Sequence, residues 1–192
     1  MKRIVAISTA FLFFGMASVG SLYAEDDIKD EDIPVAFVVI KATAEGSMIE
    51  GKIMFFETED GLYASGNVSG VDVKGKHGIH VHENGSCEDM GKAAGGHFNP
   101  HGAQHGFLPE DGLEMAHAGD MGNIEIDETG NGELKVELPQ LSLEGVHGIV
   151  GKAVILHEME DDFGQPTGNA GGRIGCGIIY SAETSEITSA EG

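Results

Sequence analysis

Seven of the nine histidines lie between His77 and Asp120, which marks this stretch as a candidate metal-binding region. His80 and His82 stand two residues apart in HGIHVHE, an alternating apolar and polar run that predicts a β-strand. Side chains two positions apart on a strand point to the same face. We therefore expect the two imidazoles to converge on one point, as ligands of a single ion would.

A second set of potential ligands follows in a segment rich in Gly, Asn and Pro, which predicts a long loop. His97, His105, His117 and Asp120 form the pattern His-x7-His-x11-His-x2-Asp. Three imidazole nitrogens and one carboxylate oxygen suit closed tetrahedral zinc. Four imidazoles suit copper, so the strand pair would need two more. His157 in AVILHE is one candidate, and His97 could serve both sites because imidazole has two ring nitrogens.

Five segments resemble successive motifs of the copper/zinc superoxide dismutase family, in the family's order: HGIHVHENGSC, AGGHFNPHGAQHG, HAGDMGN, VILHEMEDDFG and TGNAGGRIGCGI. The similarity extends from about Pro34 to Tyr180 and looks like the exported bacterial type. The resemblance implies copper ligands at His80, His82, His97 and His157. It implies zinc ligands at His97, His105, His117 and Asp120, so that His97 bridges the two ions.

The resemblance also implies an activity: two superoxide anions become dioxygen and hydrogen peroxide, with Cu(II)/Cu(I) cycling, a structural zinc and a role in antioxidant defence. His97 would release copper and take up a proton in the cycle. Arg173 matches the arginine beside the copper, and its permanently charged guanidinium can donate two parallel hydrogen bonds to a small anion. Asp161 matches the carboxylate that links a copper histidine to a zinc histidine, and Thr167 matches the residue that narrows the channel opposite the arginine. The alternative is a copper-carrying module without turnover on the same barrel.

Cys87 and Cys176 are the only cysteines in the chain. In an exported protein an isolated pair is most simply a disulfide, and a pair of thiolate metal ligands is the competing interpretation. The resemblance supports the disulfide, because the family ties the loop before its bridging histidine to the last strand.

Eight short alternating segments separated by Gly, Asp and Asn predict an antiparallel sandwich or barrel. They are VAFVVIKAT, KIMFFET, LYASGNVSGV, HGIHVHE, GNIEID, ELKVEL, KAVILHE and CGIIY. The resemblance implies an all-β fold, a flattened eight-stranded Greek-key barrel of immunoglobulin-like sandwich form with long metal-binding loops. Asn131 and Gly132 predict the turn of one hairpin, and no segment after residue 24 has helical periodicity.

Residues 1–24 have the layout of a secretory signal peptide: two basic residues, an apolar run and a small residue at the cleavage point. Leu22 is larger than usual near such a point, so an uncleaved anchor is the alternative. We expect export to the periplasm or the extracellular space, without stable membrane association after cleavage. Residues 25–33 predict an acidic disordered leader, with a metal-gathering segment as the alternative; residues 34–180 form the dismutase-like domain, and residues 181–192 a polar tail.

Removal of residues 1–24 takes away two basic residues and no acidic one, which leaves 9 basic against 32 acidic residues and a formal charge of −23. Such a chain should repel nucleic acid and anionic membranes. It should also repel an anionic substrate, and residues 158–172 contain no lysine. We therefore expect substrate attraction from Arg173, the metals and Lys74, Lys76 or Lys92, with a rate that depends weakly on salt. The sequence does not decide whether the chain forms a homodimer.

Three histidines match no ligand position of the family and are left out of both sites: His77, His101 and His147.

Overall fold

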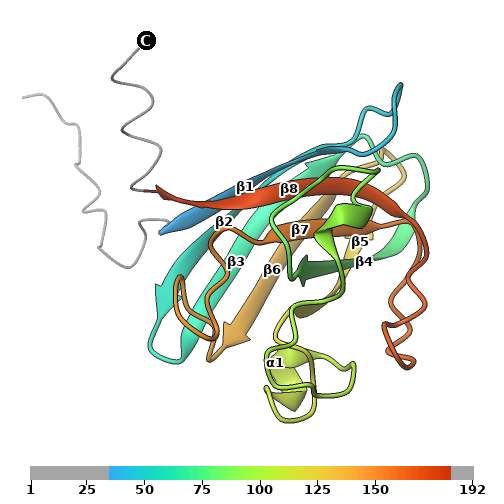
Figure 1. The fold of residues 1–192 in the computed structure, drawn as a ribbon. Helices are drawn as coiled ribbons and strands as arrows, with labels where there is room; N and C mark the ends of the chain where they lie inside the picture. The colour runs from blue at the N-terminus through green and yellow to red at the C-terminus, as the bar shows by residue number, and fades with distance from the viewer. Residues whose placement is uncertain (1–34, 183–192) are drawn as a thin grey trace, which may run out of the picture.

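Each of the eight alternating segments forms a β-strand in the computed structural model of this protein, which describes residues 35–182 (Figure 1). The strands are β1 (Ala36–Ala42), β2 (Glu50–Thr58), β3 (Gly61–Ser69), β4 (Gly75–His82), β5 (Asp120–Ile126), β6 (Gly132–Pro139), β7 (Ala153–His157) and β8 (Arg173–Ser181). The predicted signal peptide, the acidic leader and residues 183–192 of the tail lie outside the described residues. Within the described range, no helix is long and apolar enough to cross a membrane.

The strands close into a barrel in the order β1-β2-β3-β6-β5-β4-β7-β8, and all neighbouring strands are antiparallel. The chain leaves consecutive order where β3 pairs with β6 and where β4 pairs with β7, which are long crossing connections of the Greek-key kind. The predicted all-β Greek-key barrel is confirmed. The closed barrel has no free sheet edge, which makes its strands a rigid support for a site.

The core follows from the period of two in the strands. In β1, for example, Ala36, Val38 and Ile40 are fully buried, while Val39 between them is exposed. The strands β4 and β7 depart from this pattern, because nearly all of their residues are buried. A strand covered on both faces reads as a continuous buried run. Here the barrel core covers one face and the long loops cover the other, so histidines on these strands are withdrawn from water.

Two short helical turns were not predicted. The 3-10 helix η2 (Lys92–Ala94) lies in the loop after β4, and the helix α1 (Leu108–Asp111) lies between His105 and His117. Turns of three and four residues are too short for helical periodicity to reveal, so they do not conflict with the predicted all-β fold. Asp111 accepts a hydrogen bond from the Phe107 N–H at 2.7 Å. Leu108 is buried in the core, so the long segment between the two histidines is folded against the barrel.

The hairpin between β5 and β6 turns earlier than predicted. Glu128, Thr129 and Gly130 form the turn, and Gly132 already pairs with Ile126 in the ladder. Gly130 takes a φ of 78°, which only glycine adopts easily. The Asp127 carboxylate accepts hydrogen bonds from the Thr129 N–H at 2.7 Å and the Asn131 N–H at 3.1 Å. This side-chain turn, rather than the Asn-Gly pair, fixes the register.

Candidate metal centre

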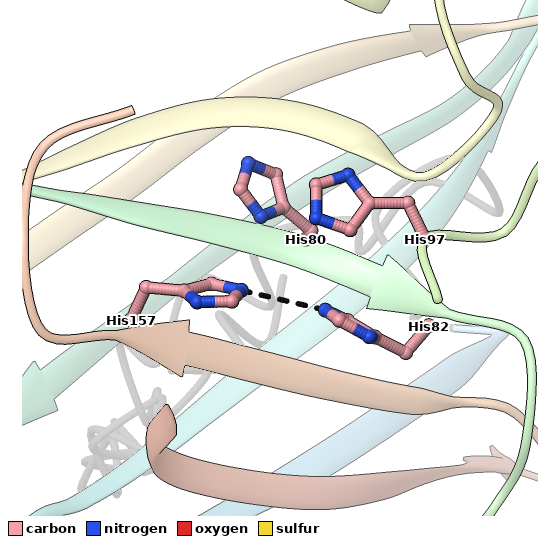
Figure 2. Close-up of side chains that lie close together, drawn as sticks. All are labelled: His80, His82, His97 and His157. Carbon is pink, nitrogen blue, oxygen red and sulfur yellow. Dashed lines mark hydrogen bonds between the residues drawn. The ribbon is translucent and has the colours of Figure 1, made fainter. Parts of the chain in front are cut away.

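The four histidines expected at copper form one buried cluster (Figure 2). His80 and His82 come from β4, His157 ends the neighbouring β7, and His97 comes from the loop that follows β4. One ring nitrogen from each lies within 4.8 Å of the others. Figure 2 shows the His82 and His157 rings facing each other and the His80 and His97 rings side by side. Two antiparallel strands and one loop therefore converge on a single point.

The loop that carries His97 is fastened to β4 by main-chain hydrogen bonds. The Phe98 N–H donates to the Val81 oxygen at 2.8 Å, and the Glu83 N–H donates to the Gly96 oxygen at 3.0 Å. These bonds form an isolated bridge between His82 and His97. His97 is thus held by main-chain hydrogen bonds, as a strand residue would be. The sequence did not predict this pairing.

The hydrogen bonds of the rings show which nitrogens face the centre of the cluster. His82 Nδ1 lies 3.0 Å from the Gly95 oxygen and His157 Nδ1 lies 3.5 Å from the Gly171 oxygen, so each Nδ1 carries the proton. The two Nε2 atoms then face each other as lone pairs at 3.4 Å. Two facing lone pairs repel each other, and a cation bound between them would remove that repulsion.

The cluster favours neutral imidazoles, the form in which histidine binds a metal. Burial lowers the pKa of His82 to about 2, helped by repulsion from His97. Burial lowers the pKa of His157 to about 3, with His80 adding repulsion. Burial also lowers the pKa of His97 to about 4, although its hydrogen bond to Asp120 works in the opposite direction. These three rings are ready to coordinate at neutral pH.

The four residues expected at zinc form a second buried cluster, which shares His97 with the first. Asp120 lies at its centre. Asp120 Oδ1 is 2.8 Å from His97 Nδ1 and 3.2 Å from His117 Nδ1, and Oδ2 is 2.9 Å from His105 Nδ1. Backbone N–H groups of Gly106 and His117 also donate to Oδ2, at 2.9 and 3.0 Å. Three Nδ1 atoms and one carboxylate thus surround one point.

A register shift in β5 aims this carboxylate. Gly78 pairs with Asn123, but His80 pairs with Asp120, so β5 carries an extra residue in between. Gly122 takes a φ of 83° at this point. Such a bulge redirects the side chains beside it. It brings the first residue of β5 to the histidine cluster.

Asp161 joins the two clusters. Its Oδ2 lies 2.7 Å from His80 Nε2, and its Oδ1 lies 2.9 Å from His105 Nε2. Because this fully buried carboxylate accepts from both Nε2 atoms, it turns the Nδ1 atom of each ring toward a cluster. A Cβ on Gly168 would lie 1.8 Å from Asp161 Oδ1, so the loop can pass this carboxylate only with glycine there.

The two Nδ1 atoms aimed in this way lack hydrogen bonds. Within residues 35–182, His80 Nδ1 and His105 Nδ1 are the buried side-chain nitrogen or oxygen atoms without a partner. His105 Nδ1 is close to Asp120 Oδ2, yet their directions do not fit a hydrogen bond. His80 belongs to the first cluster and His105 to the second. Buried polar atoms are normally paired, so these two atoms fit coordination of metal ions.

The charges at the second cluster also fit a cation. Burial opposes ionisation of Asp120 and Asp161, but hydrogen bonds from the surrounding histidines hold the pKa of both carboxyls well below the usual range. Burial alone would lower the pKa of His105, but the two carboxylates outweigh it and raise that pKa to about 9. The metal-free cluster therefore holds a proton at the place where a bound cation would balance the two negative charges.

Arg173 stands at the edge of the first cluster. It is the first residue of β8 and lies directly opposite His157 in the β7–β8 ladder. Its Nη1 donates to the Gly91 oxygen and its Nη2 donates to the Gly95 oxygen, both at 2.6 Å. The disulfide between Cys87 and Cys176 joins this loop to β8, which confirms the predicted pairing. The sequence did not reveal the two carbonyl contacts, because glycine oxygens leave no trace in a motif.

The other predicted residues have mixed positions. Lys74 pairs with Glu128 at 2.8 Å and Lys76 with Glu160 at 3.1 Å, so both charges are compensated. Lys92 is exposed on η2, and no ion pair involves it within the part of the chain that the structure describes. Thr167 is exposed in the loop before β8, and its channel role stays a prediction.

His77 is buried but belongs to neither cluster. Its Nδ1 lies 2.9 Å from the His157 oxygen and its Nε2 lies 2.8 Å from the Val73 oxygen. It was left out of the sites, and its contacts show a structural role that holds β4 against the end of β7.

A closed Greek-key barrel with two buried ligand clusters, joined by one shared imidazole and one shared carboxylate, defines a two-site metal-binding β-barrel. The family model for copper/zinc superoxide dismutase (SODC) matches residues 49–179, and the chain belongs to this family. A solved structure of the clock protein EA4 is also similar, with 38% sequence identity and a TM-score of 0.68. That match covers 77% of this chain and 95% of the other.

Proposed function

We propose that this chain is a superoxide dismutase that converts two superoxide anions to dioxygen and hydrogen peroxide. One observation carries the proposal: Arg173 is fixed by two carbonyl oxygens directly opposite His157, beside the four-imidazole cluster. A module that only carried copper would have no use for an anchored cation at that place. The family match supports the same general activity.

Two different metals fit the two clusters. Four imidazoles suit copper, and three imidazoles with one carboxylate suit closed tetrahedral zinc. The copper ligands would be His80, His82, His97 and His157, and the zinc ligands would be His97, His105, His117 and Asp120. When bound, copper would supply the one-electron oxidation and reduction that dismutation requires, and zinc would supply a fixed positive charge without redox chemistry.

Arg173 binds and orients the substrate in this proposal. A guanidinium has five N–H donors, and two of its donors hold the Gly91 and Gly95 oxygens. These contacts fix the plane of the group, and the remaining donors can bind a small anion. A charge-assisted bond to superoxide would be stronger than a neutral one, so the anion is held beside the His157 side of the cluster.

His97 handles one of the two protons that hydrogen peroxide needs. Its Nδ1 belongs to the Asp120 cluster, which leaves Nε2 for the four-imidazole cluster. Proton transfer requires hydrogen-bonding distance between donor and acceptor. His97 Nε2 would hold one proton and give it to the reduced anion, while water gives the second. The main-chain bonds of the loop return the ring to the same position after each turnover.

Export is the cellular context that we propose. The signal-like pattern of residues 1–24 supports it, and so does the disulfide, since disulfides persist in oxidising compartments such as the periplasm. Detection of the chain in a periplasmic fraction with a mature end near Ala24 would test this proposal. Recovery of an intact chain from the membrane would favour the uncleaved anchor.

The deciding experiment is superoxide dismutation by the purified protein loaded with copper and zinc, beside His82→Ala and Arg173→Ala. We expect a fast parent, an inactive His82→Ala and an Arg173→Ala that is slowed about tenfold or more, because an anion contact of this kind is lost. Metal content is measured in each sample. A parent that binds both metals and does not turn over would instead support the copper-carrying module.

A further inference from the structure

Two histidines outside both clusters face each other on the surface. His101 Nε2 lies 2.7 Å from His147 Nε2, and the ring centroids are 5.0 Å apart. His101 is exposed and His147 is half-buried. They stand 46 positions apart in the chain, in the loops that precede α1 and β7. Neither histidine takes part in the proposed reaction, so the pair could serve a separate role.

In both loops, hydrogen bonds to the main chain fix the backbone around the histidine. The Asn99 side chain donates to the Ala103 oxygen at 2.9 Å and accepts from the Ala103 N–H at 3.0 Å, which closes the loop around His101. The Ser142 N–H donates to the His147 oxygen at 3.2 Å, and the Ile149 N–H donates to the Ser142 oxygen at 3.0 Å. The two rings are therefore brought together by ordered backbone on both sides.

The pair opens onto a surface pocket of about 520 Å³. Glu114 and Gln140, whose side chains carry oxygen atoms, are among the residues that line this pocket, and Gly102, Ala103 and Leu113 complete its wall. Glu114 is exposed, so its side chain is free to turn without breaking a packed core. The pocket thus has room for an ion with bound waters, next to a negative charge.

We propose that His101 and His147 form a third metal site, for a borderline divalent transition metal with copper(II) as the favoured ion. Ligand nitrogens about 2.0 Å from a metal would be about 2.9 Å apart in neighbouring tetragonal positions and about 3.3 Å apart on a tetrahedral ion. The observed 2.7 Å is that of a hydrogen bond between the two rings, so both Nε2 atoms already lie close enough together to bind one ion after a small turn of the exposed His101 ring. Among first-row divalent ions, imidazole sites bind copper(II) most strongly. Water completes the coordination shell. The ion would fasten the loop before α1 to the loop before β7.

The test is a titration of the copper- and zinc-loaded protein with further Cu²⁺ in excess Mg²⁺, followed by equilibrium dialysis and elemental analysis. Mg²⁺ occupies carboxylates, which prefer hard cations, but competes poorly for imidazole. We expect one extra equivalent of copper, with an electron paramagnetic resonance spectrum that shows coupling to two nitrogens. His101→Ala and His147→Ala should each weaken this binding at least tenfold.

The matched control is Val146→Ala, which changes an exposed neighbour of His147 without removing a ligand atom. It should keep the extra equivalent, and all variants should keep the metals bound before the titration. Absence of the extra copper in the parent would overturn the proposal, and so would its retention by both histidine variants. The comparison measures a difference between parent and variants, so it holds whether or not the protein turns over superoxide.

Discussion

Arg173 lies directly opposite His157 in the ladder between β7 and β8, one step beyond a register shift. The preceding pair joins Leu156 to Gly175, so Ile174 is the extra residue of β8. A bulge re-aims the side chains next to it. Here the main-chain pairing of β7 with β8 by itself places the Arg173 side chain beside the four-imidazole cluster.

The anchored plane of Arg173 leads to a prediction for a substitution that keeps the charge. Arg173→Lys should lower kcat/KM, because an ammonium cannot hold the Gly91 and Gly95 oxygens and also bind the anion in a fixed direction. We expect a loss of up to about tenfold, against about tenfold to a hundredfold for Arg173→Ala, whose charged hydrogen bond is worth about 1.5–3 kcal/mol. Pulse radiolysis at constant ionic strength would measure both. Equal rates for the lysine variant and the parent would show that the anchoring has no role.

Asp161 should control the affinity of both metal sites. The two carboxylate oxygens of Asp161 accept hydrogen bonds from the Nε2 atoms of His80 and His105. Asp161→Asn keeps only one side-chain oxygen, so one of the two rings loses the hydrogen bond that orients it. Partners of this kind change metal affinity by about 10- to 100-fold. Competition with a chelator, followed by elemental analysis, would measure the loss.

The neighbouring Asp162 provides the control for that experiment. It is exposed and accepts from the Asn169 side chain at 3.1 and 3.2 Å, away from both clusters. Asp162→Asn should retain both metals like the parent. Equal metal loss in the two variants would assign the effect to the loop as a whole.

The metal-free protein should be most stable near pH 6.5. In the unfolded chain, histidines take up a proton below a pKa of about 6.5. In the folded protein the pKa is lowered to about 4 for His97, about 3 for His157 and about 2 for His82, so these three rings stay neutral to lower pH. Unfolding is therefore favoured increasingly as the pH falls from 6.5 to 4. His105 acts in the opposite sense: its pKa is raised to about 9, so its contribution is complete below 6.5 and is lost as the pH rises through 9.

Thermal unfolding of the metal-free protein between pH 4 and pH 9.5 would test this profile. The midpoint should decline on both sides of the maximum, more steeply on the acid side, where three histidines act together. A midpoint that stays constant from pH 6.5 to 4.5 would contradict the neutral state of the buried imidazoles.

Substrate attraction should depend on Lys92 more than on the other surface lysines near the barrel. Lys92 lies on η2, between the two glycines whose oxygens hold Arg173. Lys92→Ala should lower kcat/KM a few-fold at low salt, and the parent's own rate should fall only gently as salt increases. Lys74→Ala is the matched control, since Glu128 already compensates that charge. A steep salt dependence in the parent would point to a stronger source of steering.

The sequence by itself determined the strands and the chemical types of the ligands. Spacing of two places His80 and His82 on one face in any β-strand, and alternation marks the eight strands, because both are properties of the local backbone. The family motifs supplied the remaining candidates, including the pairing of Cys87 with Cys176. Neither turn η2 nor turn α1 was predicted, since three or four residues carry no periodic signal.

Only the tertiary structure decided how those residues are joined. The resemblance implied the shared position of His97 and the link through Asp161, and the structure supplies the distances of both. The carbonyl clamp on Arg173 was not expected, and it links segments that are far apart in the chain. The facing rings of His101 and His147 belong to the same kind of relationship. Such contacts depend on strand register and on the path of each loop, which result from packing of the whole barrel rather than from any local run of residues.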